Sequence, residues 1–282
     1  MDTEWTPDEN TLQELMQLLD MSRNLNVKST KEHADRITEN QAKLNEYSND
    51  IVFINYMAYI FGMLDDSNFE LRQLAGLALK YQIEVKFAYM HAHALEYCKK
   101  MIMNAYMSQA KVVRQTAWNV ISLIILKGGI NAWSDILEFL TGQISSTDDE
   151  IIETSVQAIS FIVEDSESLL GEAKYAEEID ALFPNLCQLL ICEPQKNENI
   201  ISIVVNTINM LIVLNTQIIY DSTEQYLEVL IKLFDIESVS IKTRVIQGIT
   251  MILDFRMELI LKHHEVTMQK VLEALNYKGK FL

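Results

Sequence analysis

The chain has 282 residues and a formal net charge of −17, from 40 acidic and 23 basic side chains. This charge repels a phosphate backbone, which argues against nucleic acid as a main partner and favours a basic protein surface. With 49% hydrophobic residues but only 3 Pro and 8 Gly, the composition favours helix throughout and argues against strands. The three cysteines form no CxxC pair, which indicates a reducing compartment, and the first residues carry no secretory signal pattern.

Apolar residues at helical spacing predict a series of paired helices along the chain. The first helix is expected at 9–23, after Thr6-Pro7-Asp8, and its more polar partner at 31–47 has the pattern of a terminal repeat with one face in water. The next pairs are expected at 50–64 with 68–87, 91–107 with 109–127, 133–144 with 148–169, 181–192 with 197–220, and 223–235 with 238–255. A seventh first helix at 264–276 has no predicted partner, so we expect the array to continue beyond this sequence.

Three local features refine this arrangement. The turn Asp65-Asp66-Ser67-Asn68 supplies a helix N-cap and early-helix acids, of which Asp66 is expected to be exposed. The segment 170–180 is expected to be an insert between the fourth and fifth pairs. Pro184 is placed in the first turn of its helix, where the missing N–H costs little.

A short phrase recurs in the second helices of these pairs: a branched apolar residue, a polar residue and, three positions further on, a small or branched residue. Its polar members are separated by 42, 39, 49 and 40 residues and are Arg72, Arg114, Glu153, Ser202 and Lys242. Paired-helix HEAT and armadillo repeats have periods of about 40 to 47 residues. The sequence therefore predicts an all-α superhelix, a HEAT-repeat or armadillo-like solenoid of about six and a half helix pairs. Such a solenoid is right-handed with its second helices on the concave side, and it binds partners on a surface.

The uncharged segment 200–220 has about the length of a membrane span. Polar residues recur in it at helical spacing, however, and several Asn side chains in hydrocarbon would be costly. We therefore expect a buried helix of the solenoid and no membrane insertion.

The sequence contains no phosphate-binding glycine loop, nucleophile elbow or HExxH motif, so we do not expect an enzyme. The histidines show no ligand spacing with a cysteine or carboxylate pattern, and acids such as Asp148 precede helices, where N-capping explains them. We therefore expect no catalytic residue, no metal site and no cofactor.

Two stretches carry a family resemblance: Trp5-Thr6-Pro7-Asp8 with Leu12-Gln13-Glu14-Leu15, and 71–80 with the sequence LRQLAGLALK. They resemble the amino-terminal module of the importin-beta (karyopherin-beta) superfamily. Further matches narrow the resemblance to its transportin group: Lys127-Gly128 with Trp133 and Asp135-Ile136-Leu137, Glu164-Asp165-Ser166, and Arg256-Met257 with Leu261-Lys262-His263. The resemblance implies one solenoid over 1–282, with 1–87 similar to the Ran-binding module and 88–282 forming further HEAT repeats that end within a repeat.

Members of this family are nuclear import receptors, located in the cytoplasm, the nucleus and the nuclear pore. The resemblance therefore implies binding of Ran-GTP and of Phe-Gly nucleoporins in protein import into the nucleus. Because the family binds its cargo in later repeats, cargo binding is expected only in a longer form of the chain. Period and charge alone also allow a generic HEAT-repeat scaffold or adaptor of another protein complex.

Four residues are candidates for the contact with Ran. Lys80 and Lys127 stand near the ends of predicted second helices, where cations also favour the helix dipole. Glu164 and Asp165 form an acidic cluster that could pair with a basic GTPase surface, and acids at a helix C-terminus oppose the dipole. Tyr81 replaces the Asn usual in the family, so no role passes to it from the resemblance.

Overall fold

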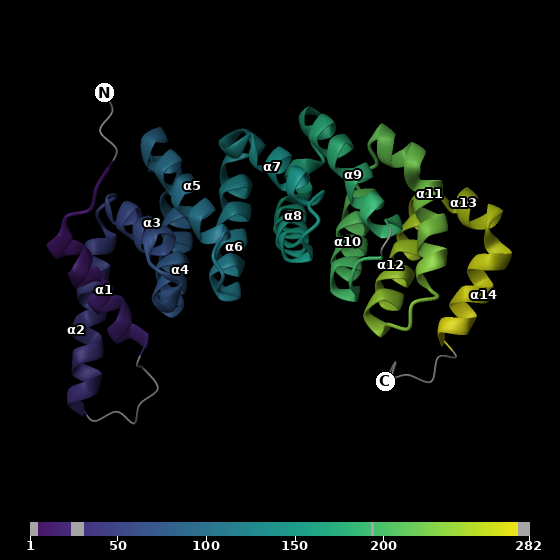
Figure 1. Cartoon of the computed structure of the whole chain (residues 1–282). Helices are drawn as coiled ribbons and strands as arrows, with labels where there is room; N and C mark the ends of the chain where they lie inside the picture. Colours follow the sequence, from purple (N-terminus) through teal and green to yellow (C-terminus); the bar gives the residue numbers. More distant parts are fainter. Residues whose placement is uncertain (1–4, 24–30, 193–194, 276–282) are drawn as a thin grey trace. The chain divides into compact units, whose positions relative to one another are not determined.

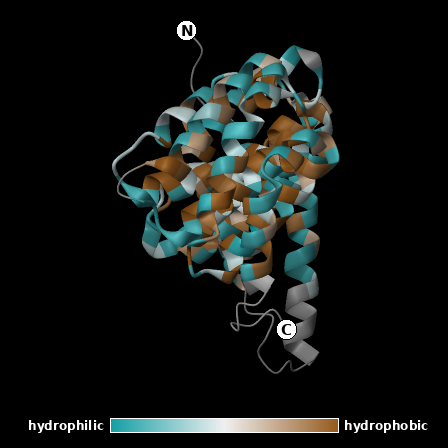
Figure 2. Ribbon diagram, turned by 90° about the vertical axis from the view of Figure 1, so that its right-hand side faces the viewer, coloured by the Kyte–Doolittle hydropathy of each residue, from teal (hydrophilic) through white to brown (hydrophobic). Residues whose placement is uncertain are grey.

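The computed structural model describes residues 5–23, 31–192 and 195–275, and that part consists of helices joined by loops and contains no strand, as predicted (Figure 1). It divides into two compact units, 1–128 and 129–282. The helices are amphipathic, and Figure 2 shows hydrophobic and hydrophilic stretches alternating along them. This is the all-α, helix-pair solenoid architecture that the 40-residue period predicts.

The described residues of unit 1 form three helix pairs. Their bounds are Glu9–Arg23 (α1) with Lys31–Ser48 (α2), Phe53–Met63 (α3) with Phe69–Lys86 (α4), and Ala92–Tyr106 (α5) with Lys111–Gly128 (α6). Helix α3 packs on α5 and α4 packs on α6, so first helices contact first helices and second helices contact second helices. The core between these two layers is fully buried and apolar, and includes Phe61, Leu79, Ile102 and Ile121.

Unit 2 repeats this arrangement with Ile136–Gln143 (α7), Asp149–Leu170 (α8), Ala176–Ile191 (α9), Glu198–Ile212 (α10), Gln217–Leu233 (α11) and Val239–Phe255 (α12). Helices α8, α10 and α12 form one layer, and α7, α9 and α11 form the other. Two further helices follow, Met257–Lys262 (α13) and His264–Leu275 (α14), so the single helix predicted at 264–276 is preceded by a short one.

Two boundaries in unit 2 differ from the prediction. The helix expected at 197–220 ends at Ile212, and α11 starts at Gln217 instead of 223. Asn215 causes the break because it adopts a positive φ of 48°, the left-handed conformation that commonly ends helices and that Asn tolerates. Thr216 then caps α11 by accepting a hydrogen bond from the Ile219 N–H. Within the described part of the chain, no helix has the length and apolarity needed to span a bilayer.

The position of Pro184 also differs from the prediction. Helix α9 begins at Ala176, inside the segment 170–180 that was predicted to be an insert, so Pro184 lies in the helix interior. A proline there removes the hydrogen bond to the carbonyl four residues earlier. The neighbouring Asn185 side chain donates to the Ala181 carbonyl at 2.8 Å, which adds a polar contact in the same turn.

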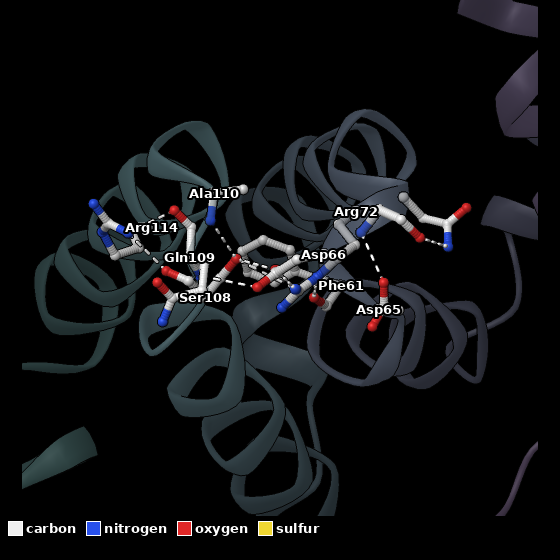
Figure 3. A network of polar contacts seen from close by, with 10 residues as sticks. Phe61, Asp65, Asp66, Arg72, Ser108, Gln109, Ala110 and Arg114 are labelled. Atoms are coloured by element: carbon white, nitrogen blue, oxygen red, sulfur yellow. Dashed lines mark hydrogen bonds and ion pairs between the residues drawn. The ribbon is translucent and has the colours of Figure 1, made fainter.

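The prediction that Asp66 is an exposed turn acid is wrong. Its carboxylate contacts the Arg72 guanidinium and the Ser108 hydroxyl and accepts the Gln109 N–H at 2.9 Å (Figure 3). Arg72 is only 4% exposed and also donates to the Phe61 carbonyl at 2.9 Å. We call Asp66, Arg72 and Ser108 the inter-repeat clamp, because it ties the turn and second helix of one pair to the loop of the next.

Two other polar positions of the recurring phrase, Glu153 and Ser202, make links between repeats, whereas Arg114 donates to the Ser108 and Gln109 carbonyls of its own pair. Glu153 on α8 accepts a hydrogen bond from Asn199 on α10 at 2.8 Å, and Ser202 on α10 bonds to Ser240 on α12 at 2.7 Å. Each of these contacts joins one second helix to the next in the same layer. At three of its five positions, Arg72, Glu153 and Ser202, the recurring phrase thus marks a polar contact between repeats, beside the apolar core.

Candidate interaction surface

Lys80 lies on the second helix α4 and is half-buried. Its ammonium donates to the Asn119 side chain on α6 at 3.4 Å, so it bridges two neighbouring second helices. This bridge uses part of its hydrogen-bonding capacity, and the remaining donors stay available to a partner.

Lys127 lies in the last turn of α6 and is exposed. It stands eight residues beyond Asn119, which corresponds to about 12 Å along the helix axis at 1.5 Å per residue. Lys80 and Lys127 therefore occupy different levels of the same helix layer, and a partner would need an extended contact to reach both.

Glu164 and Asp165 lie on α8 in unit 2 and are both exposed. The helix changes direction directly after them, because Ser166 has non-helical backbone angles, φ −120° and ψ 19°. The acidic cluster therefore stands at a kink within α8, and the helix continues to Leu170 instead of ending there.

Helix α4 also carries an exposed apolar stripe, which lies outside the four residues expected to contact Ran. Leu77, Tyr81 and Val85 follow each other at four-residue spacing, which places them on one face, and Tyr81 is 61% exposed. The buried side of the same helix uses other positions, such as Leu79 and Ile83. The spacing was visible in the sequence, but a helix with apolar residues on several faces does not reveal which face its neighbours leave open.

On the other layer, a cleft of about 180 Å³ opens between the first helices α9 and α11. Its lining is mostly apolar and includes Phe183, Pro184, Cys187, Ile191 and Val229. Ile191 is exposed at its edge, and burial raises the pKa of the Cys187 thiol to about 12, so this thiol stays protonated and behaves as an apolar group. The cleft can accept a small apolar or aromatic side chain.

A further cluster of ionisable groups lies where α11 meets the junction of α13 and α14. The Glu224 carboxylate is contacted by the Lys262 ammonium and lies 3.0 Å from Nε2 of His263. The hydrogen bond from Lys262, and then that from His263, lowers the pKa of the Glu224 carboxyl below its usual value. Glu228, one turn further along α11, completes the cluster.

No protein-family model matches the chain. Among curated proteins, transportin-1 of Mus musculus is 26% identical over 263 residues, which covers 93% of this chain and 28% of that protein. Transportin of Dictyostelium discoideum is 23% identical over 278 residues, 99% of this chain and 29% of that protein. Importin subunit beta-2 of Schizosaccharomyces pombe is 25% identical over 260 residues, which covers 90% of this chain and 27% of that protein. The chain thus spans less than a third of the length of these relatives.

Solved structures share the fold. Kap121p superposes with a TM-score of 0.72 at 12% identity and covers 96% of this chain and 25% of its own. Kap121p bound to Nup53p superposes with a TM-score of 0.69 at 11% identity and covers 94% of this chain and 24% of its own. Importin beta superposes with a TM-score of 0.64 at 16% identity and covers 89% of this chain and 30% of its own. Along nearly the whole chain this protein is thus similar in sequence to transportins, and it shares the helix-pair fold of the solved karyopherin-beta structures.

Proposed function

We propose that this chain is part of a nuclear import receptor that binds the GTP-loaded form of Ran and the Phe-Gly repeats of nucleoporins. The similarity to transportins over 93% and 99% of the chain is the observation that supports this function best. In this proposal the protein works by binding and not by catalysis, passes between cytoplasm and nucleus through the pore, and takes import cargo only in a longer form.

The Ran contact is proposed on the second helices. In unit 1 the α4 stripe of Leu77, Tyr81 and Val85 offers an apolar contact surface, and Lys80 stands next to Tyr81 on the same helix. Lys127 adds an exposed cation on α6 of the same unit. In unit 2, taken by itself, Glu164 and Asp165 are exposed acids on α8 and are proposed as a separate contact. An apolar patch rimmed by charges is typical of protein interfaces, where the charges mainly steer the encounter.

Binding to Ran tests the proposal directly. We expect the chain to bind Ran loaded with a GTP analogue and to bind GDP-loaded Ran much more weakly, as measured by surface plasmon resonance. A charge at the rim of an interface acts mainly on the association rate, and over distances beyond about 8 Å its effect is screened at physiological ionic strength. Asp165→Lys should therefore slow association, and the difference from wild type should shrink as salt is raised.

Asp254→Lys is the matched control, because Asp254 is also an exposed acid near the end of a second helix, α12. Equal association rates for the two variants would remove Glu164 and Asp165 from the proposed contact. Failure to distinguish GTP-loaded from GDP-loaded Ran would contradict the receptor function as a whole and favour a generic HEAT-repeat scaffold.

The cleft between α9 and α11 is the proposed place for a nucleoporin phenylalanine. Its apolar lining and its size suit a single aromatic ring, and a structure similar in fold, that of Kap121p, was solved bound to Nup53p. Ile191→Asp puts a charge at the edge of this cleft and should weaken binding of a Phe-Gly repeat peptide by about tenfold or more, because burying one aliphatic side chain contributes about 1.5–3 kcal/mol.

Fluorescence anisotropy with a labelled Phe-Gly peptide measures this effect. Met107→Asp serves as the control, since Met107 is an exposed apolar residue outside the residues that line the cleft. If both variants bind the peptide as the wild type does, the nucleoporin contact lies elsewhere.

A further inference from the structure

Glu224, Glu228 and His263 come together although 39 positions separate the first from the last in the sequence. Glu224 and Glu228 are four residues apart on α11, so both carboxylates leave the same face of the helix. His263 is the residue between α13 and α14. One ligand atom from each of the three side chains lies within 4.8 Å of the others.

We propose that these three residues bind a divalent transition-metal ion of the zinc type. An imidazole nitrogen with two carboxylates is a donor set that suits Zn²⁺, Co²⁺ or Mn²⁺, whereas Mg²⁺ and Ca²⁺ prefer oxygen ligands alone. Three protein ligands leave a fourth position of a tetrahedral zinc ion for water.

The distances fit this ion with a small movement. Zinc holds carboxylate oxygen and imidazole nitrogen at about 2.0–2.2 Å, so its tetrahedral donors lie about 3.4 Å from each other. His263 Nε2 and Glu224 Oε1 are 3.0 Å apart, which is already close to that spacing. Glu228 is exposed, and its flexible side chain can rotate inward to supply the third donor.

Lys262 competes with the metal for this position. Its ammonium contacts the same Oε1 atom of Glu224 that faces His263. The Lys262 side chain is 63% exposed, so it can turn into solvent when an ion arrives. This competition makes a specific prediction: removing the lysine charge should strengthen metal binding.

The ion would connect α11 of the sixth helix pair with α13 and α14. A ligand that binds only the folded arrangement stabilises it in proportion to the logarithm of its concentration relative to Kd. Metal binding should therefore raise the unfolding temperature of unit 2 and protect the amides of α13 and α14 from hydrogen exchange.

The experiment uses the full chain without an affinity tag. Isothermal titration with Zn²⁺ and absorption spectroscopy with Co²⁺ measure affinity and ligand field in the wild type and in Glu228→Gln, His263→Gln and Lys262→Gln. We expect one saturable site in the wild type and binding weaker by at least about tenfold in the first two variants, since even a lost outer ligand partner costs 10–100-fold. Lys262→Gln should bind more tightly than the wild type.

Two controls separate this site from adventitious binding. His91→Gln removes an exposed histidine that lies close in sequence to the exposed His93, and Asp254→Asn removes an exposed acid of the same unit outside the cluster. Both should bind Zn²⁺ as the wild type does.

Circular dichroism identifies any variant that fails to fold, and hydrogen exchange with and without Zn²⁺ in the wild type then tests the site independently. The proposal would be overturned if the wild type showed no saturable site, or if Glu228→Gln and His263→Gln bound Zn²⁺ as tightly as the wild type. It would also be overturned if Zn²⁺ did not protect the amides of α13 and α14 from exchange.

Discussion

Replacing Asp66 by asparagine is expected to destabilise unit 1 by about 3 kcal/mol at neutral pH, near the lower end of the cost of breaking a buried ion pair. The Arg72 guanidinium is almost fully buried and would lose its counter-charge in this variant, while Ser108 and the Gln109 N–H would lose a charged acceptor. Urea unfolding followed by far-ultraviolet circular dichroism measures the change. Asp66 itself is about one-third exposed, which is why the lower end of the range applies.

Asp65→Asn is the matched control because it removes the same charge one residue earlier. Asp65 is exposed and accepts the Ser67 N–H at 2.9 Å, a capping bond that asparagine also makes well. We therefore expect this variant to unfold close to the wild type. Equal destabilisation by the two substitutions would mean that the turn, and not the inter-repeat clamp, needs the negative charge.

The contribution of Asp66 should depend on pH in a defined direction. Burial alone would raise the pKa of its carboxyl, but the bonds from Ser108 and Gln109 and the charge of Arg72 outweigh it and lower the pKa below its ordinary value of 3.8. A carboxyl whose pKa is lower in the folded state stabilises above its unfolded pKa and loses this effect as the pH falls through the folded pKa. The difference between wild type and Asp66→Asn should thus be full at pH 7 and shrink below about pH 4.

Gly62→Ala is the second substitution with a large expected effect. It should lower the free energy of unfolding, whereas helix propensity alone would raise it. In a helix interior, alanine is favoured over glycine by about 1 kcal/mol. At Gly62 on α3, however, a Cβ atom would meet the backbone of Met101 on α5, with the Met101 Cα at 2.8 Å and the carbonyl carbon at 2.9 Å. Backbone atoms cannot rotate away, so the two first helices must separate, and we expect a net loss of about 2 kcal/mol.

Gly142→Ala provides the contrast. Gly142 is an exposed glycine of α7, and a Cβ atom added there meets nothing within 4 Å. It should therefore stabilise unit 2 by about 0.5–1 kcal/mol. Differential scanning calorimetry of both variants measures the two shifts. A rise in the unfolding temperature of Gly62→Ala would show that α3 and α5 are not packed as closely as described.

The sequence by itself determined the features that depend on neighbours within a few turns. The recurring phrase and the apolar spacing predicted helix pairs, and the predicted bounds of α1, residues 9–23, agree with the structure. The resemblance to transportins, quoted from residues 5–15, 71–80 and 127–263, agrees with the curated proteins to which the chain is similar. The assignment of Lys80, Lys127, Glu164 and Asp165 to Ran binding stays a prediction.

Only the tertiary structure decided what the polar residues do. In the sequence Asp66 has the pattern of a turn acid, but in the fold Ser108 and Arg72 contact it. The cluster of Glu224, Glu228 and His263 forms because α11 packs near His263. The tertiary structure also showed that Pro184 lies within α9 and that the helix expected across the uncharged segment 200–220 is interrupted at Asn215. A helix forms from interactions between residues three and four positions apart, so its periodicity is visible in the sequence. Contacts between residues some 35 to 45 positions apart depend on how one helix pair packs on the next, and that packing is a property of the assembled solenoid.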